Sequence, residues 1–167
     1  MTDPTRFIGR PHDFDFLCGH WQLTNRRLRA RLAGCTDWDE FPATLDARVL
    51  LDGAVSVDET RFPTQGFTGM TLRSLDRATQ QWAIYWINSR DGLLTPPVHG
   101  GFDGDRGEFF GVDTDAGRAV DVRFIWNRGV EAARWEQAFA LPGSGAWETN
   151  WVMEMRRGET RRADASA

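Results

Sequence analysis

The sequence predicts an all-β protein, an up-and-down antiparallel barrel of about ten strands with a short N-terminal helical turn. Ten short segments alternate in polarity with a period of two, as half-buried strands do. The connections between them are mostly short and rich in Gly, Asp, Asn and Pro, which tight hairpins require. Helical patterns are few. Because a long meander leaves two unpaired edges, closure into a barrel is the expected arrangement.

The strands are expected one after another along the whole chain. They cover residues 19–31, 41–51, 54–62, 66–75 and 81–89, and then 97–103, 107–113, 118–126, 132–141 and 146–156. Residues 12–18 predict the helical turn, and residues 34–40 predict a longer connection or a single helical turn. The length of 167 residues fits one domain, which we expect to span residues 1–157, with a flexible polar tail at 158–167.

The composition argues against several classes of protein. A net charge of −4 without a compact basic tract disfavours a nucleic-acid partner. The chain has no lysine, which excludes Schiff-base catalysis and a P-loop lysine. Cys18 and Cys35 have no metal-ligand spacing, and no apolar run is long enough to cross a membrane. No secretory signal is visible. We therefore expect a cytoplasmic protein without metal or cofactor and without a membrane partner.

Several stretches resemble known barrel proteins. FLCGHW at 16–21 is similar to the Gly-x-Trp signature that opens the first strand of lipocalin-type barrels. The chain also resembles a bacterial family of unknown function with a calycin-like (lipocalin and fatty-acid-binding-protein-like) barrel. The matching stretches are HDFDFLCGHW, RLRARLAGCTDWDEF, TLRSLDRATQQWAIYW, PPVHGGF, GEFFGVDT, VRFIW, WEQAF and WETNWVMEM, which together run from about residue 12 to 155. The resemblance implies the barrel and no particular activity. His99 stands where the family pattern has an aliphatic residue.

The last hairpin, WEQAFALPGSGAWETNWVMEM at 135–155, has two possible registers, and a slip of one residue exchanges its faces. We favour the register that places most apolar side chains on one face of the hairpin and most charged side chains on the other. It directs Trp135, Phe139, Trp147, Trp151, Met153 and Met155 inward together with Gln137 and Thr149. Arg134, Glu136, Glu148, Asn150 and Glu154 then face outward. Gln137 and Thr149 inside would suit binding, whereas Glu136 or Asn150 inside would favour proton chemistry.

Eight Trp and eleven Phe indicate an aromatic-lined cavity or a subunit interface. The leading hypothesis is that the barrel binds a small hydrophobic or aromatic molecule. The residues expected to contact it are Arg73, Tyr85, Trp86, Arg123, Trp135, Gln137, Thr149, Asn150 and Trp151. Residues 81–89 are apolar on both faces, so we also expect a homodimer through their outer face. The alternative is that the N-terminal segment covers that face.

Charged residues within strands suggest further hypotheses. A pair between Glu59 and Arg73 would be a structural ion pair or an anchor for a ligand carboxylate. Glu59, His99 and Glu136 are acid/base candidates for a cofactor-independent cyclase, isomerase or lyase. A second alternative is haem binding through His99, or a non-catalytic oligomeric scaffold. Residues 25–32, NRRLRARL, carry arginines on one face, either a solvated rim or a means of steering an anion to the barrel mouth.

Overall fold

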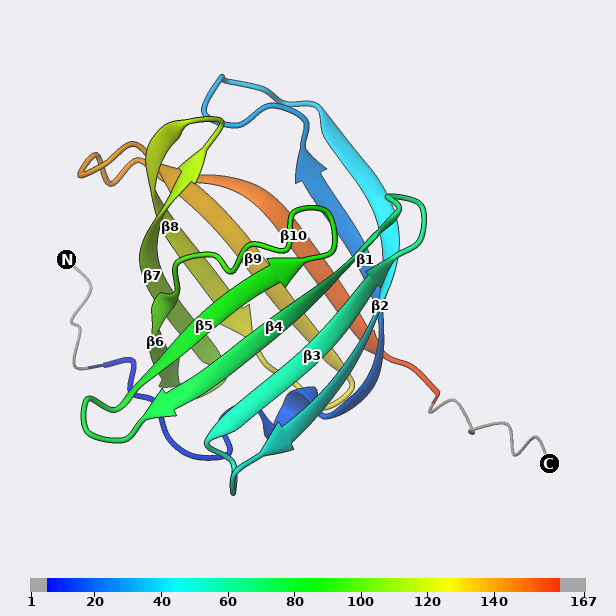
Figure 1. The fold of residues 1–167 in the computed structure, drawn as a ribbon, viewed down its shortest axis with the longest axis vertical. Coiled ribbons are helices and arrows are strands. Elements are labelled where there is room, and N and C mark those ends of the chain that lie inside the picture. The colour runs from blue at the N-terminus through cyan, green and yellow to red at the C-terminus, as the bar shows by residue number, and fades with distance from the viewer. Residues whose placement is uncertain (1–5, 160–167) are drawn as a thin grey trace.

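The computed structural model describes residues 6–159, and these form a closed barrel of ten antiparallel strands (Figure 1). Each strand pairs with the next one along the chain, and the first strand pairs with the last. The strands are β1 (Gly19–Leu28), β2 (Trp38–Leu50), β3 (Val55–Phe62), β4 (Phe67–Asp76), β5 (Gln81–Asn88), β6 (Val98–Asp103), β7 (Arg106–Asp115), β8 (Arg118–Asn127), β9 (Ala132–Ala140) and β10 (Glu148–Arg157). The all-β, up-and-down barrel predicted from the sequence is confirmed.

The period of two in the sequence becomes the inside and the outside of the barrel. On β1, Trp21, Leu23 and Asn25 are buried, whereas the intervening Gln22 and Thr24 are exposed. The same alternation on the other strands forms one continuous hydrophobic core in the interior. In a small barrel the inward side chains meet across the lumen, so positions distant in sequence come together.

A single helical element is present in residues 6–159, the 3-10 turn η1 (Asp15–Leu17) within the stretch where a turn was expected. The other stretch considered for a helical turn, residues 34–40, instead ends a connection, and β2 begins at Trp38. No helix in this part of the chain is long and apolar enough to cross a membrane. Of the predicted polar tail, residues 160–167 lie outside the described residues.

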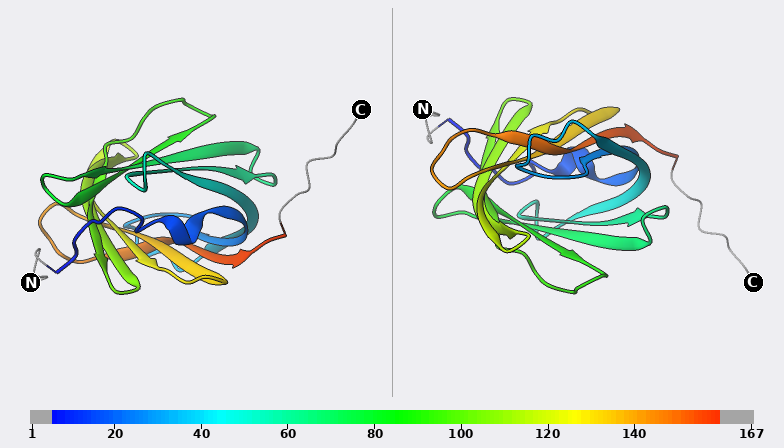
Figure 2. Two further views of the ribbon diagram at one scale, coloured as in Figure 1. Left: turned by 90° about the horizontal axis from the view of Figure 1, so that it is seen from below. Right: turned by 90° about the horizontal axis from the view of Figure 1, so that it is seen from above.

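The N-terminal segment closes one end of the barrel, which we call the closed end (Figure 2). Phe14 is 1% exposed, and its ring packs edge-on against Trp82 and Phe102, with centroids 5.0 and 5.2 Å away. Upstream, Ile8 bridges to Phe102 on β6. The crossing is so close that a Cβ at Gly101 would lie 2.3 Å from the backbone carbon of Ile8. Glycine at 101 therefore lets the segment lie against the barrel.

The opposite end carries the connections 29–37, 63–66, 89–97, 116–117 and 141–147, and we call it the mouth (Figure 1). Within the described residues, these connections contribute the half-buried Leu32 to the core, whereas the closed end contributes Phe14, which is 1% exposed. The barrel thus has one end plugged by its own chain and one end surrounded by hairpin loops. This difference between the two ends determines from which side a ligand could enter the barrel.

Candidate functional site

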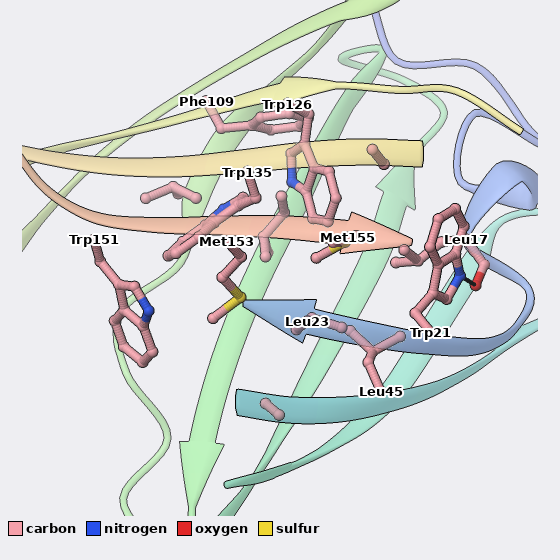
Figure 3. Packing of buried hydrophobic residues seen from close by; sticks show 14 of the residues in the cluster. Leu17, Trp21, Leu23, Leu45, Phe109, Trp126, Trp135, Trp151, Met153 and Met155 are labelled. Carbon is pink, nitrogen blue, oxygen red and sulfur yellow. Dashed lines mark hydrogen bonds between the residues drawn. The ribbon is translucent and has the colours of Figure 1, made fainter. Parts of the chain in front are cut away.

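The barrel interior contains a cavity of about 110 Å³. Its wall is mainly aromatic and aliphatic, and Figure 3 shows several of its side chains in the core. Exposed Pro96 and Val112 also line it, so the cavity reaches the surface on the mouth side. The polar residues in its wall are Asp58, Thr60, Thr71, Arg73, Thr95, Asp113 and Gln137.

Three tryptophans form much of the cavity wall. The ring of Trp151 lies 5.8 Å from that of Trp135 and 6.5 Å from that of Trp86, at interplanar angles of 81° and 82°. Such edge-to-face packing is the preferred geometry of aromatic pairs. Trp86 fits there because β4 carries Gly69 beside it, where a Cβ would lie 1.9 Å from the Trp86 ring. These three residues were expected in the wall, and the structure brings them together.

The last hairpin follows neither of the two simple registers, because a β-bulge lies between Thr149 and Trp151. Trp151 pairs with Gln137, as the favoured register requires, but Thr149 pairs with Ala138, which alternates away from the cavity. Asn150 is fully buried, and its side-chain carbonyl accepts a hydrogen bond from Gln137 Nε2 at 2.9 Å. The expected inward direction of Thr149 and outward direction of Asn150 were therefore wrong. One extra residue in a bulge exchanges the two faces.

Trp147 lies two residues before Thr149, on the same side of the bulge, and therefore faces outward as Thr149 does. Its ring contacts exposed Phe110 at 6.0 Å and the guanidinium of Arg123 at 5.0 Å, both on the outer surface. The expectation that Trp147 faces inward was wrong for the same reason. The hairpin nevertheless directs Trp135, Trp151 and Met153 to the cavity.

A buried ion pair stands where the cavity meets the closed end. Arg73 Nη2 donates to the Asp58 carboxylate at 2.5 Å, and the side chains are 2% and 0% exposed. Arg73 Nη1 donates to Ser56 Oγ at 3.3 Å, and Thr60 Oγ1 donates to the same carboxylate at 3.2 Å. The guanidinium also lies 5.0 Å from the centre of the Phe14 ring. A pair so enclosed is retained only when both charges have partners.

The predicted partner of Arg73 was Glu59, which is wrong, because the adjacent residue Asp58 forms the ion pair. Ser56 pairs with Arg73 across β3 and β4, so Asp58, two residues along, is its diagonal neighbour on the inner face. Glu59 points outward and forms an exposed ion pair with Arg61.

A second arginine, Arg27, lies at the mouth. Its guanidinium carbon is 4.7 Å from the centre of the Trp151 ring, and the side chain is half-buried. Burial lowers the pKa of Arg27, and the positive charges of Arg31 and Arg90 lower it further, against the opposing effect of Asp115. Arg27 forms no ion pair with a carboxylate in the described part of the chain, and the nearby Asp115 pairs with Arg31 at 2.6 Å. Arg27 is thus a partly desolvated cation beside the cavity wall.

The three acid/base candidates lie outside the cavity. His99 is exposed on β6, and Glu136 pairs outside the barrel with Arg134 at 2.9 Å. Together with Glu59, they lack the desolvated position in the cavity on which their proposed chemistry depended. His99 is likewise directed away from the interior in which a haem would have to bind. The residues found to line the cavity include no histidine, and their carboxylates are Asp58 and Asp113.

Two further predicted contact residues also face outward. Tyr85 alternates with the cavity-lining Ile84 and Trp86 on β5. Arg123 is on the outer face of β8, where burial lowers its pKa and the charges of Glu108 and Glu136 oppose that effect. The N-terminal segment, in its described part, covers the closed end and not the face that carries Tyr85. The homodimer through that face stays a prediction, which light scattering of the purified chain would test.

Asp58, Trp126 and Arg27 belong to the site but were not among the residues predicted from the sequence to contact a ligand. Alternation alone would have identified Asp58, since it shares a strand face with Phe62, the apolar residue that ends β3. Trp126 was recognised only as part of a strand, although it alternates with Val122 and Val120. Arg27 carried a signal that is typical of a solvated rim, and only its stacking on Trp151 distinguishes it from the neighbouring arginines.

In comparisons with known proteins, no family model and no curated protein matches the chain. The closed ten-stranded barrel agrees with the architecture that the resemblance implied.

Proposed function

We propose that the protein binds a small hydrophobic or aromatic molecule in the barrel cavity. The observation that carries this proposal is an apolar cavity of about 110 Å³ walled by Trp86, Trp135 and Trp151 and reaching the surface at the mouth. An engineered apolar cavity of roughly 150 Å³ takes up benzene or xenon. The volume here therefore suits a ligand whose buried part is about one aromatic ring.

Binding is better supported than acid/base catalysis. A general acid or base in such a site needs a perturbed, available titratable group. Asp58 is engaged with Arg73, and Asp113 lies at the mouth side of the cavity. Asn150, the polar residue that the bulge turns inward, is an amide and does not transfer protons at physiological pH. Neither cavity-lining carboxylate is both enclosed and free of an ion pair, because Asp58 is paired and Asp113 is only half-buried, so the cyclase, isomerase or lyase alternative is less well supported.

The test is a titration of the protein with toluene and with naphthalene, followed by tryptophan fluorescence and calorimetry. We expect saturable binding of toluene and weaker binding of the two-ring compound, because the cavity volume accommodates about one ring. Failure of both probes to bind at any concentration below their solubility would contradict the proposal.

A cavity-filling variant sharpens the test. Val122 is 4% exposed and lines the cavity from β8, so Val122→Trp should occupy the space and abolish toluene binding. The matched control is Val57→Trp, on the outer face of β3, which should bind toluene as the wild type does. Since overpacking costs about 1–3 kcal/mol, circular dichroism must show that both variants are folded. Xenon uptake by wild-type crystals tests the cavity without any substitution.

A further inference from the structure

Two hydrogen-bond donors at the closed end of the cavity have no acceptor. Arg73 Nε and Trp126 Nε1 are both buried without a hydrogen-bond partner, and the two side chains are 2% and 3% exposed. Both residues line the cavity. Their side chains are neighbours, since the guanidinium carbon of Arg73 lies 5.6 Å from the centre of the Trp126 ring. Buried donors are nearly always satisfied in native proteins, so two unsatisfied ones in the wall of the cavity point to an acceptor inside it.

Trp126 differs in this respect from other buried tryptophans of the barrel. Trp21 Nε1 donates to the Leu17 carbonyl at 2.8 Å, and Trp82 Nε1 donates to the Asp13 carboxylate at 3.1 Å. Trp151 Nε1 donates to Asn25 Oδ1 at 3.0 Å. The fold therefore provides an acceptor for each of these indoles. Figure 3 shows the Trp126 indole directed into the barrel between Trp135 and Met155.

The charge at this end determines what kind of acceptor fits. Arg73 is already neutralised by Asp58 at 2.5 Å, and Ser56 accepts a second hydrogen bond from it. An incoming anion would gain little from a paired guanidinium and would be repelled by the buried Asp58 carboxylate. A neutral oxygen, by contrast, accepts from the free N–H groups without adding charge to a site with low polarity.

We infer that the ligand is a neutral, one-ring-sized molecule bearing a carbonyl or ether oxygen, and that this oxygen accepts a hydrogen bond from Trp126 Nε1, with Arg73 Nε as second donor. The inference rests on the proposed function and specifies the ligand class. In this arrangement the ring lies among Trp86, Trp135 and Trp151, and the oxygen points to the closed end. Trp126 becomes a specificity-determining residue.

The experiment compares acetophenone with α-methylstyrene, which has the same shape but carries a methylene group in place of the carbonyl oxygen. Binding to the full chain is measured by calorimetry. We expect acetophenone to bind wild-type protein about tenfold more tightly, the ratio that one buried hydrogen bond supports. Benzoate, the anionic counterpart, should bind more weakly than acetophenone.

Trp126→Phe removes the N–H and keeps an aromatic ring. We expect the affinity ratio of acetophenone to α-methylstyrene to fall from about ten to about two in this variant, because Trp126 Nε1 is lost as the main donor and only Arg73 Nε remains. The matched control is Trp21→Phe, whose indole N–H is already bonded to Leu17 and which is not part of the cavity wall. This variant should keep the wild-type ratio.

The outcomes separate the inference from the proposed function. Equal affinity of wild-type protein for acetophenone and α-methylstyrene would overturn the inference and leave the proposed function standing. The inference would also be overturned if Trp126→Phe kept the wild-type affinity ratio of acetophenone to α-methylstyrene. It would be overturned as well if benzoate bound more tightly than the other probes. Binding of none of the probes would overturn the proposed function together with the inference. A tenfold ratio that only Trp126→Phe abolishes supports both.

Discussion

The closed end and the mouth each contain an arginine beside a tryptophan, yet the two arginines are held differently. Arg73 is 2% exposed and ion-paired with Asp58, whereas Arg27 is half-buried over Trp151 without a carboxylate partner in residues 6–159. The difference follows from access to water. A guanidinium shut inside the barrel needs a counter-charge, while one at the rim keeps part of its hydration. The pairing of an internal charge thus marks which end of the cavity is sealed.

The comparison also separates two possible roles for charge in binding. The closed end offers hydrogen-bond donors without net charge, and the mouth offers an unpaired positive charge. A ligand entering the barrel would meet the cation first and the neutral donors last. Substitutions at the closed end and at the mouth should therefore differ in how much they lower the stability of the fold.

The largest expected effect is the loss of the partner of Arg73. Asp58→Asn leaves a buried guanidinium without its counter-charge and should lower the free energy of unfolding by about 3–5 kcal/mol. Glu59→Gln, the adjacent and exposed position, is the matched control and should change stability by less than about 0.5 kcal/mol. Urea denaturation of both variants measures the difference, and similar losses would refute the assignment of the internal pair.

The next largest loss of stability is expected from removing an aromatic ring at each end of the barrel. Phe14→Ala removes the ring that plugs the closed end and should cost about 3 kcal/mol. Phe67→Ala, at the mouth, removes a half-buried ring that stacks on Phe62 at 4.5 Å and should cost about half as much. Thermal unfolding of the two variants would show whether the ends differ in packing. A greater loss at Phe67 would reverse the comparison.

A smaller effect is expected at Arg27. Arg27→Gln loses the stacking on Trp151 but also removes a desolvated charge repelled by Arg31 and Arg90. These contributions oppose each other, so we expect stability to change by less than about 1 kcal/mol. Arg26→Gln, which loses an outer contact with Trp38, serves as the control. A loss above about 2 kcal/mol at Arg27 would show that its charge has a partner inside the fold.

The smallest effect is expected in the β4–β5 turn at the closed end. The backbone amides of Thr79 and Ala78 donate to Asp76 and lower its pKa. A carboxylate whose pKa is lower in the folded state stabilises the protein above its unfolded value of about 4, and this stabilisation disappears as the pH falls through the folded pKa. The stability difference between wild type and Asp76→Asn should therefore shrink between pH 7 and pH 3. A stability difference that stays constant over this pH range would show that the pKa of Asp76 is not lowered in the folded state.

The order of strands was predictable because polarity alternates along nearly every segment and the turns are marked by their residues. The inner and outer faces were predictable for the same reason wherever a strand runs without interruption, as for Trp82, Ile84 and Trp86. The site was less predictable. A bulge leaves no polarity signal of its own, so Thr149, Asn150 and Trp147 were given the wrong direction.

The internal ion pair shows a second limit of sequence reasoning. Asp58 and Glu59 are adjacent carboxylates, and only the register with β4 decides which of them meets Arg73. Glu59 shares its strand face with Val55 and Val57, yet these two valines are only half-buried on the outside of the barrel. Apolar residues occur on both faces of a barrel, so polarity identifies the inner face only when a whole strand is considered.

Closure of the barrel between β1 and β10 has a consequence for the order of assembly. The seam pairs Trp21 with Arg157 and Arg27 with Trp151, so it joins the first strand to the last. During synthesis β1 must wait for the final strand to leave the ribosome, with one row of backbone groups unpaired. Contacts of such long sequence separation form slowly, because a large loop has to close before they are made. We therefore expect barrel closure between β1 and β10 to be the rate-limiting step of folding.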